Sequence, residues 1–234
     1  MSVFTQFAHR VTDDRVITTT RASGYTLAQY MGIYLWLPML LMGAIAVFTG
    51  FGLGIAQGAI GADLFETFDA GDKADFETLG ALSAGFVVLG IGFLLSSISF
   101  ALARIAGVFR VGGGQVQAAA GNEVRILAMP WTAWAFLMLM MMGFMTVIAG
   151  FIVHVIAASE IHDAWTGATS LSEPGNASDL GLANTLTTWA GPVARFGVGM
   201  LFTGIAFMLA TIIHILRFQA NRITQLATER RRSG

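Results

Sequence analysis

The chain has 234 residues, of which 55% are hydrophobic and only 12% are charged. A soluble domain carries about 25% charged residues, so this composition excludes an ordinary soluble enzyme and indicates a chain that lies largely in lipid. The chain has no cysteine, which excludes disulfides, thiolate metal sites and thiol-linked haem. The formal net charge is -1, so the chain lacks the excess of basic residues that binds nucleic acid, and no nucleic-acid partner is expected.

Residues 1–27 form a leader that carries Arg10, Arg15 and Arg21 ahead of the first apolar run. That run is much longer than the roughly 7–15 apolar residues of a cleaved signal peptide. We therefore expect the run to remain in the membrane as an anchor.

Four long apolar runs dominate the chain, at about 28–58, 79–109, 130–158 and 190–216. Each exceeds the about 20 residues with which a helix crosses a bilayer. They are apolar on all sides instead of alternating, which favours helices over the strands of a barrel. The predicted fold class is an all-α integral membrane protein with four transmembrane helices.

The polar segments between these runs set the expected boundaries. We expect a first hairpin over 28–110, a cytoplasmic connector over 111–129, a second hairpin over 130–217 and a basic cytoplasmic tail over 218–234. Three consecutive glycines at 112–114 are expected to end the second helix. The polar segments 63–77 and 159–188 are expected to lie outside the membrane as loops.

The two hairpins resemble each other in sequence. A shift of 107 residues lays the second apolar run over the fourth with nine identities in 21 positions, and Arg110 then matches Arg217. A shift of 100 residues lays the first run over the third and matches Gly43 with Gly143. The pattern predicts two tandem hairpins in the same orientation, a parallel repeat. Chance identity between apolar helices is the alternative.

Basic residues are distributed unevenly. All but two of the 13 lie in the leader, in or beside the connector, or in the tail; the exceptions are Lys73 and Arg195. The positive-inside rule then predicts that both termini are cytoplasmic, and we expect the inner membrane of a bacterium. The acidic segment 63–77 would face outward, either docking a basic soluble partner by electrostatic steering or serving as a solvated loop.

Two histidines lie in the apolar runs, His154 in the third and His214 in the fourth. Such a pair suggests haem ligation. Because the two helices are antiparallel, the histidines differ in depth by about 20 residues, or roughly 30 Å, which one iron cannot bridge. They remain weak candidates for a haem shared with another subunit or for a quinone site.

A second group of polar residues follows the third run. His154, His162 and Asp163 are candidate ligands for copper, zinc or iron. In a continuous helix the two histidines would lie about 12 Å apart, so a metal site requires the helix to fold back near Ser159. The alternative is a set of interfacial polar residues at a helix end.

Arg195 lies a few residues inside the fourth run and is expected to be a buried charge near His154. An unpaired charge within a span costs several kcal/mol, so it needs an acceptor. Glu160, Asp163, a lipid or a partner subunit could supply one.

Small residues recur at helical spacing in the first two runs. The candidate helix-packing positions are Gly43, Gly50, Gly54, Gly58, Gly85 and Gly92. Such faces let helices approach closely, either within the chain or between this chain and a partner.

No nucleophile, base and orienting group stand together, so the chain is not expected to be an enzyme on its own. The function favoured is a non-catalytic accessory or scaffolding subunit of a larger membrane complex. It would contact lipids and other subunits or copies of itself, and it would need no cofactor. The alternatives are a redox subunit that supplies histidines to haem, copper or a quinone site, and a small transporter or channel.

Overall fold

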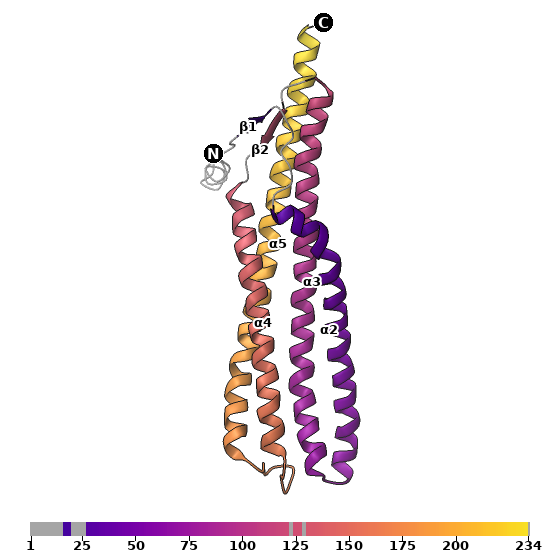
Figure 1. The fold of residues 1–234 in the computed structure, drawn as a ribbon, viewed down its shortest axis with the longest axis vertical. Coiled ribbons are helices and arrows are strands. Elements are labelled where there is room, and N and C mark those ends of the chain that lie inside the picture. The colour runs from indigo at the N-terminus through magenta and orange to yellow at the C-terminus, as the bar shows by residue number, and fades with distance from the viewer. Residues whose placement is uncertain (1–15, 20–26, 122–123, 128–129, 234) are drawn as a thin grey trace, which may run out of the picture. The chain divides into compact units, whose positions relative to one another are not determined.

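A computed structural model describes residues 16–19, 27–121, 124–127 and 130–233 (Figure 1). About 90% of the described residues are helical. In chain order its elements are β1 (Val16–Thr19), α2 (Leu27–Glu66), α3 (Ala70–Ala119), β2 (Val124–Leu127), α4 (Trp131–Trp165) and α5 (Ala177–Ser233).

Within the described residues, four helical stretches are long and apolar enough to cross a membrane: Tyr30–Leu64, Ala70–Ala119, Trp131–Trp165 and Ala177–Thr228. The prediction of four such helices is confirmed. All four exceed the about 20 residues that a bilayer requires. The surplus is largest in α3 and α5, whose candidate spans contain 50 and 52 residues.

The helices run further than the hydropathy pattern predicted. α3 continues through the glycines at 112–114 and ends only at Ala119, so the predicted break is wrong. Each glycine costs a helix about 1 kcal/mol relative to alanine. Tertiary packing requires a glycine at 113, because a side chain there would collide with Gln219 of α5. The helix stops near Gly121, which has a φ of 72° that suits a helix C-terminus.

The two segments expected as outer loops are also mostly helical. Only residues 67–69 connect α2 to α3, and 166–176 connect α4 to α5. The two helices that follow, α3 and α5, have caps at their N-termini. Asp69 Oδ1 accepts a hydrogen bond from the backbone N–H of Gly71 at 2.7 Å, and Asn176 Oδ1 accepts one from the backbone N–H of Ser178 at 3.1 Å. Because these caps satisfy free backbone donors, polar sequence remains helical there.

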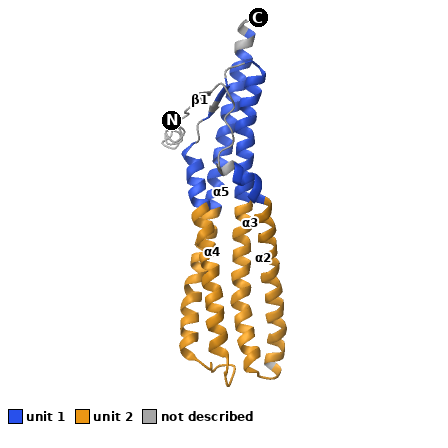
Figure 2. Ribbon diagram, in the orientation of Figure 1, with its two compact units in different colours: residues 1–36, 98–140, 202–234 blue, residues 37–97, 141–201 orange. Residues whose placement is uncertain are grey.

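The chain divides into two compact units, to which all four helices contribute (Figure 2). Unit 1 comprises Met1–Trp36, Ile98–Met140 and Phe202–Gly234; unit 2 comprises Leu37–Ser97 and Met141–Leu201. Unit 2 is a set of four helical segments that run side by side.

The two hairpins of unit 2 pack through equivalent glycines. A Cβ at Gly90 would lie 2.9 Å from the carbonyl oxygen of Gly43, and one at Gly197 would lie 2.8 Å from that of Gly143. These pairs match under the sequence shifts of 107 and 100 residues. Helix backbones therefore approach closely at corresponding places in α2–α3 and α4–α5.

Unit 1 contains a short antiparallel sheet, in which Val16 pairs with Leu127 and Thr19 with Val124. The strands fall within the segments predicted as leader and connector, where no strand was expected. β2 is tied to α3 by Gln117, whose side chain donates to the Arg125 carbonyl at 3.1 Å and accepts from the Arg125 N–H at 2.9 Å.

Candidate functional site

An open cavity lies between α3 and α5 in unit 1, with a volume of about 1340 Å³. Apolar side chains that include Val108, Phe109, Val116 and Ile223 form much of its wall. Pockets for small ligands usually measure about 300–1,000 Å³, so this cavity has room for a larger molecule.

Small residues on α3 leave this space open. Gly112 lines the cavity, and a Cβ built there would meet nothing within 4 Å. Gln219, which also lines the cavity, bridges the helices by donating from its side-chain amide to the Phe109 carbonyl. The two helices are thus held together beside a gap that their side chains do not fill.

Arg222 of α5 is the unusual residue of the cavity. It is only 8% exposed, and its Nη1 donates to Gln225 Oε1 at 3.2 Å. Its Nε is buried and has no hydrogen-bond partner in the part of the chain that the structure describes. Burying a charge without a partner is costly, because the protein does not replace the water that is removed.

The charge of the cavity is positive. Arg231 lines it together with Arg222, and no acidic side chain of the described residues does. A guanidinium group matches the geometry of carboxylate and phosphate oxygens. The cavity therefore combines cationic hydrogen-bond donors with apolar walls.

Unit 2 holds a second buried cation, which is surrounded differently. Lys73 is 8% exposed and lies 2.5 Å from Glu77 Oε1. Its Nζ also lies 4.4 Å from the centre of the Trp165 ring and 5.8 Å from that of Phe76. Carboxylate and aromatic faces both stabilise an ammonium group. Lys73 is therefore satisfied by the chain itself.

The candidate metal ligands do not converge. His154 is buried in α4, where its Nδ1 lies 2.9 Å from the Gly150 carbonyl oxygen. His162 is half exposed and its Nδ1 lies 3.7 Å from Asp75 Oδ1. α4 does not fold back at Ser159 but continues to Trp165, so eight helical residues still separate the histidines. Within the described ranges, no three histidine, aspartate or glutamate side chains are placed to hold a metal ion.

His154 instead fills space between helices. A Cβ at Gly85 of α3 would lie 3.0 Å from the His154 Cβ. The neighbouring Phe151 ring packs edge-on against Phe86, with ring centres 5.0 Å apart. His214, the other candidate for haem or quinone, is half-buried in unit 1.

Arg195 is not buried within the chain, in contrast to what its position in an apolar run suggested. Its side chain is exposed on unit 2. No ion pair with Glu160 or Asp163 is found among the residues described. The reason is rotational: Ala194, the adjacent residue, is the one that packs against Gly150 of α4.

The glycines of α2 fall into two groups. Gly43 and Gly50 pack within the chain, since a Cβ would lie 2.8 Å from Leu94 and 2.7 Å from Val87 of α3. Gly54 would meet only Ser83 Oγ, at 3.2 Å, and Gly58 would meet nothing within 4 Å. On α3, Gly92 would meet Val147 of α4 at 2.6 Å.

Nothing in the sequence distinguishes Arg222 from the other arginines that follow the fourth apolar run. The cavity also depends on α3 continuing past Gly112, where a break was predicted. A helical reading of 112–120 would have placed small residues on the face toward α5. No family model, curated protein or solved structure matches this chain.

Proposed function

We propose that the protein is a non-catalytic accessory or scaffolding subunit of a larger membrane complex, and that α2 presents a surface to a neighbouring membrane helix. The observation that carries this proposal is the uneven burial of the spans. Half of the residues in the most apolar stretch of α3 are buried, but only 17% of those in α2.

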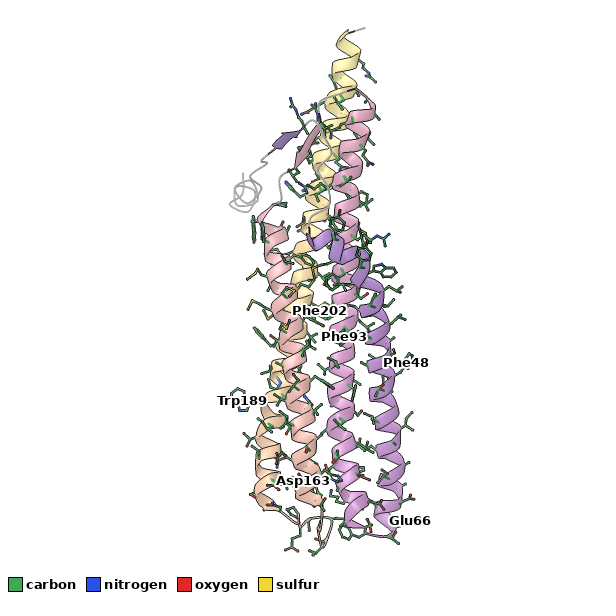
Figure 3. The ribbon with its side chains drawn as sticks, in the orientation of Figure 1. Phe48, Glu66, Phe93, Asp163, Trp189 and Phe202 are labelled. Atoms are coloured by element: carbon green, nitrogen blue, oxygen red, sulfur yellow. The ribbon has the colours of Figure 1, made fainter. Side chains whose placement is uncertain are left out.

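The exposed surface of α2 combines large and small residues, as a surface that packs against another helix does. Phe48, Phe51 and Ile55 are 74%, 61% and 76% exposed, and Phe48 points away from α3 (Figure 3). Between them lies Gly52, where a Cβ would meet nothing within 4 Å. Small residues flanked by large ones let a second helix approach closely in lipid.

This surface differs from the one that holds α2 in the chain. Gly43, Ala46 and Gly50 are buried, and the last of these accepts a hydrogen bond from Ser83 through its carbonyl, at 2.8 Å. A partner on α2 is therefore proposed not at Gly43 and Gly50, which pack within the chain, but on the opposite side of the helix, around Gly52.

Two leucine substitutions test the proposal. Gly52→Leu would fill the docking face and weaken association by about 1–3 kcal/mol, with the chain itself still stable. The measurement is cross-linking from Ile55→Cys in native membrane, followed by purification in mild detergent, with differently tagged copies to detect self-association. The matched control is Gly199→Leu on α5, where a Cβ also meets nothing within 4 Å. Undiminished cross-linking in Gly52→Leu would show that Gly52 is not part of the contact, and an absence of cross-linking from Ile55→Cys without the leucine substitution would show that this face contacts only lipid.

The orientation and origin of the scaffold are part of the proposal. The distribution of arginines supports cytoplasmic termini in a bacterial inner membrane. The equivalent glycine contacts in the two hairpins support a parallel repeat. Because the chain has no native cysteine, labelling of Asp72→Cys and Ser172→Cys is a clean test. Labelling of either residue only from the cytoplasm would reverse the assignment.

A further inference from the structure

The cavity between α3 and α5 in unit 1 has properties that the scaffold role does not require. We propose that it binds an anionic phospholipid, with the phosphate on Arg222, the positive charge of Arg231 adding to the attraction, and the lipid's apolar part against the α3–α5 walls. The site would attach the protein to one class of lipid, independently of what contacts α2.

Arg222 is more than nine-tenths buried, and its Nε has no hydrogen-bond partner among the described residues. A buried guanidinium that lacks a counter-charge is stabilised by any anion that can reach it. Arg231 adds a second positive charge, and no carboxylate of the described residues lines the cavity to neutralise the pair. Phosphate oxygens accept from a guanidinium in a paired geometry, which favours them over a monovalent ion.

The walls of the cavity are apolar on both helices. Val108 and Phe109 end the apolar run 79–109, so the cavity begins where the bilayer core would end. Further along, Val116 and Ile223 are 62% and 60% exposed beside the two arginines. A molecule that covers both kinds of surface must be an anionic amphiphile. Basic pockets between membrane helices are known to take phospholipid head groups.

A free phosphate ion has the same charge chemistry but no apolar part. It would fill a small fraction of about 1340 Å³ and leave Val116 and Ile223 in water. A phospholipid covers both the arginines and the apolar walls. The lipid is therefore the occupant that the cavity fits.

Native mass spectrometry of the full-length protein in mild detergent tests this directly. The probes are phosphatidylglycerol, zwitterionic phosphatidylcholine and inorganic phosphate. The variant is Arg222→Gln, and its control is Arg217→Gln, which removes an exposed arginine of the same helix that does not line the cavity. Circular dichroism checks that both variants remain helical.

We expect phosphatidylglycerol to bind at least about tenfold more tightly than phosphatidylcholine. Arg222→Gln should lower that affinity about tenfold or more, as the loss of a charge-assisted hydrogen bond does. Arg217→Gln should change it less than about twofold. Equal binding of the two lipids, or unchanged affinity in Arg222→Gln, would overturn the proposal. Displacement of the lipid by millimolar phosphate would identify a phosphate site instead and overturn the lipid assignment.

A second variant leaves both arginines in place. Gly112→Leu puts a side chain into the empty part of the cavity, where a Cβ meets nothing within 4 Å. It should lower phosphatidylglycerol affinity about tenfold and leave the protein folded. Gly181→Leu, another open helical glycine, lies outside the cavity and should have no effect. Unchanged lipid binding in Gly112→Leu would show that the lipid lies elsewhere.

Discussion

Lys73 of unit 2 and Arg222 of unit 1 are equally buried, each 8% exposed, yet their surroundings differ. Lys73 has a carboxylate at 2.5 Å and two aromatic rings. Arg222 has one amide, that of Gln225 at 3.2 Å, and an Nε without a partner among the described residues. The local sequence explains the contrast, because Glu77 follows Lys73 by one helical turn, whereas an uncharged glutamine follows Arg222.

The difference separates two roles for a buried cation. Lys73 stabilises the junction of α3 with α4 and needs nothing from outside the chain. The Arg222 guanidinium has no counter-charge within the described chain, so an external anion that binds it would stabilise it. The following substitutions test whether this distinction holds.

The largest effect is expected where Lys73 loses its aromatic contact. Trp165 is 8% exposed and belongs to a buried cluster with Ala74, Ile161 and Ala183. Trp165→Ala should lower the free energy of unfolding by about 3–5 kcal/mol through the cavity it leaves. Thermal unfolding in detergent measures this. A loss below about 1 kcal/mol would mean that the cluster is not part of the folded core.

A smaller loss of stability is expected when Lys73 keeps its contacts with the Trp165 and Phe76 rings but loses the carboxylate of Glu77. Glu77→Gln retains the shape of the side chain and removes the charge 2.5 Å from Lys73 Nζ. Because Glu77 is partly exposed, water replaces some of the interaction, and we expect a loss of about 1–2 kcal/mol. Glu66→Gln, at the end of α2, is the comparison and should stay within about 0.5 kcal/mol. If Glu77→Gln and Glu66→Gln lower the free energy of unfolding equally, the contact of Glu77 with Lys73 does not stabilise the fold.

The smallest change in stability is expected at Arg222 itself in lipid-free detergent. Arg222→Gln removes a buried charge that has no counter-charge, so the free energy of unfolding should change by less than about 1 kcal/mol or rise. Chemical unfolding of the delipidated protein measures it. A loss of about 3 kcal/mol or more would show that Arg222, like Lys73, is satisfied by the chain.

The sequence predicted the helices better than their ends. Lipid forces each span to satisfy its own backbone hydrogen bonds, so an apolar run of 25 residues can only be a helix. Outside the lipid, polar sequence forms either helix or loop. Whether a polar segment becomes helix or loop depends on caps such as Asp69 and on packing such as that of Gly113 against Gln219. Hydropathy predicts neither of these.

The candidate site was missed for the same reason. Arg217 and Arg222 both follow the fourth apolar run and look alike in sequence. Five helical residues rotate one about 140° from the other, so only one of them faces α3. Which one it is depends on α3 continuing beyond Arg110. Rotation also decides the place of Arg195, which is exposed within the chain because its neighbour Ala194 takes the position that packs against α4.

Our central claim is that an anionic lipid supplies the counter-charge that Arg222 lacks within the described chain. The most direct measurement is the unfolding free energy of the wild type and Arg222→Gln with increasing phosphatidylglycerol, with phosphatidylcholine as the reference. We predict that the wild type gains about 2.7 kcal/mol when the lipid is at 100 times its Kd. At that lipid concentration Arg222→Gln, which is expected to bind about tenfold or more weakly, should gain at most about 1.4 kcal/mol, whereas Glu77→Gln should gain as much as the wild type. An equal gain in the wild type and Arg222→Gln would contradict the claim.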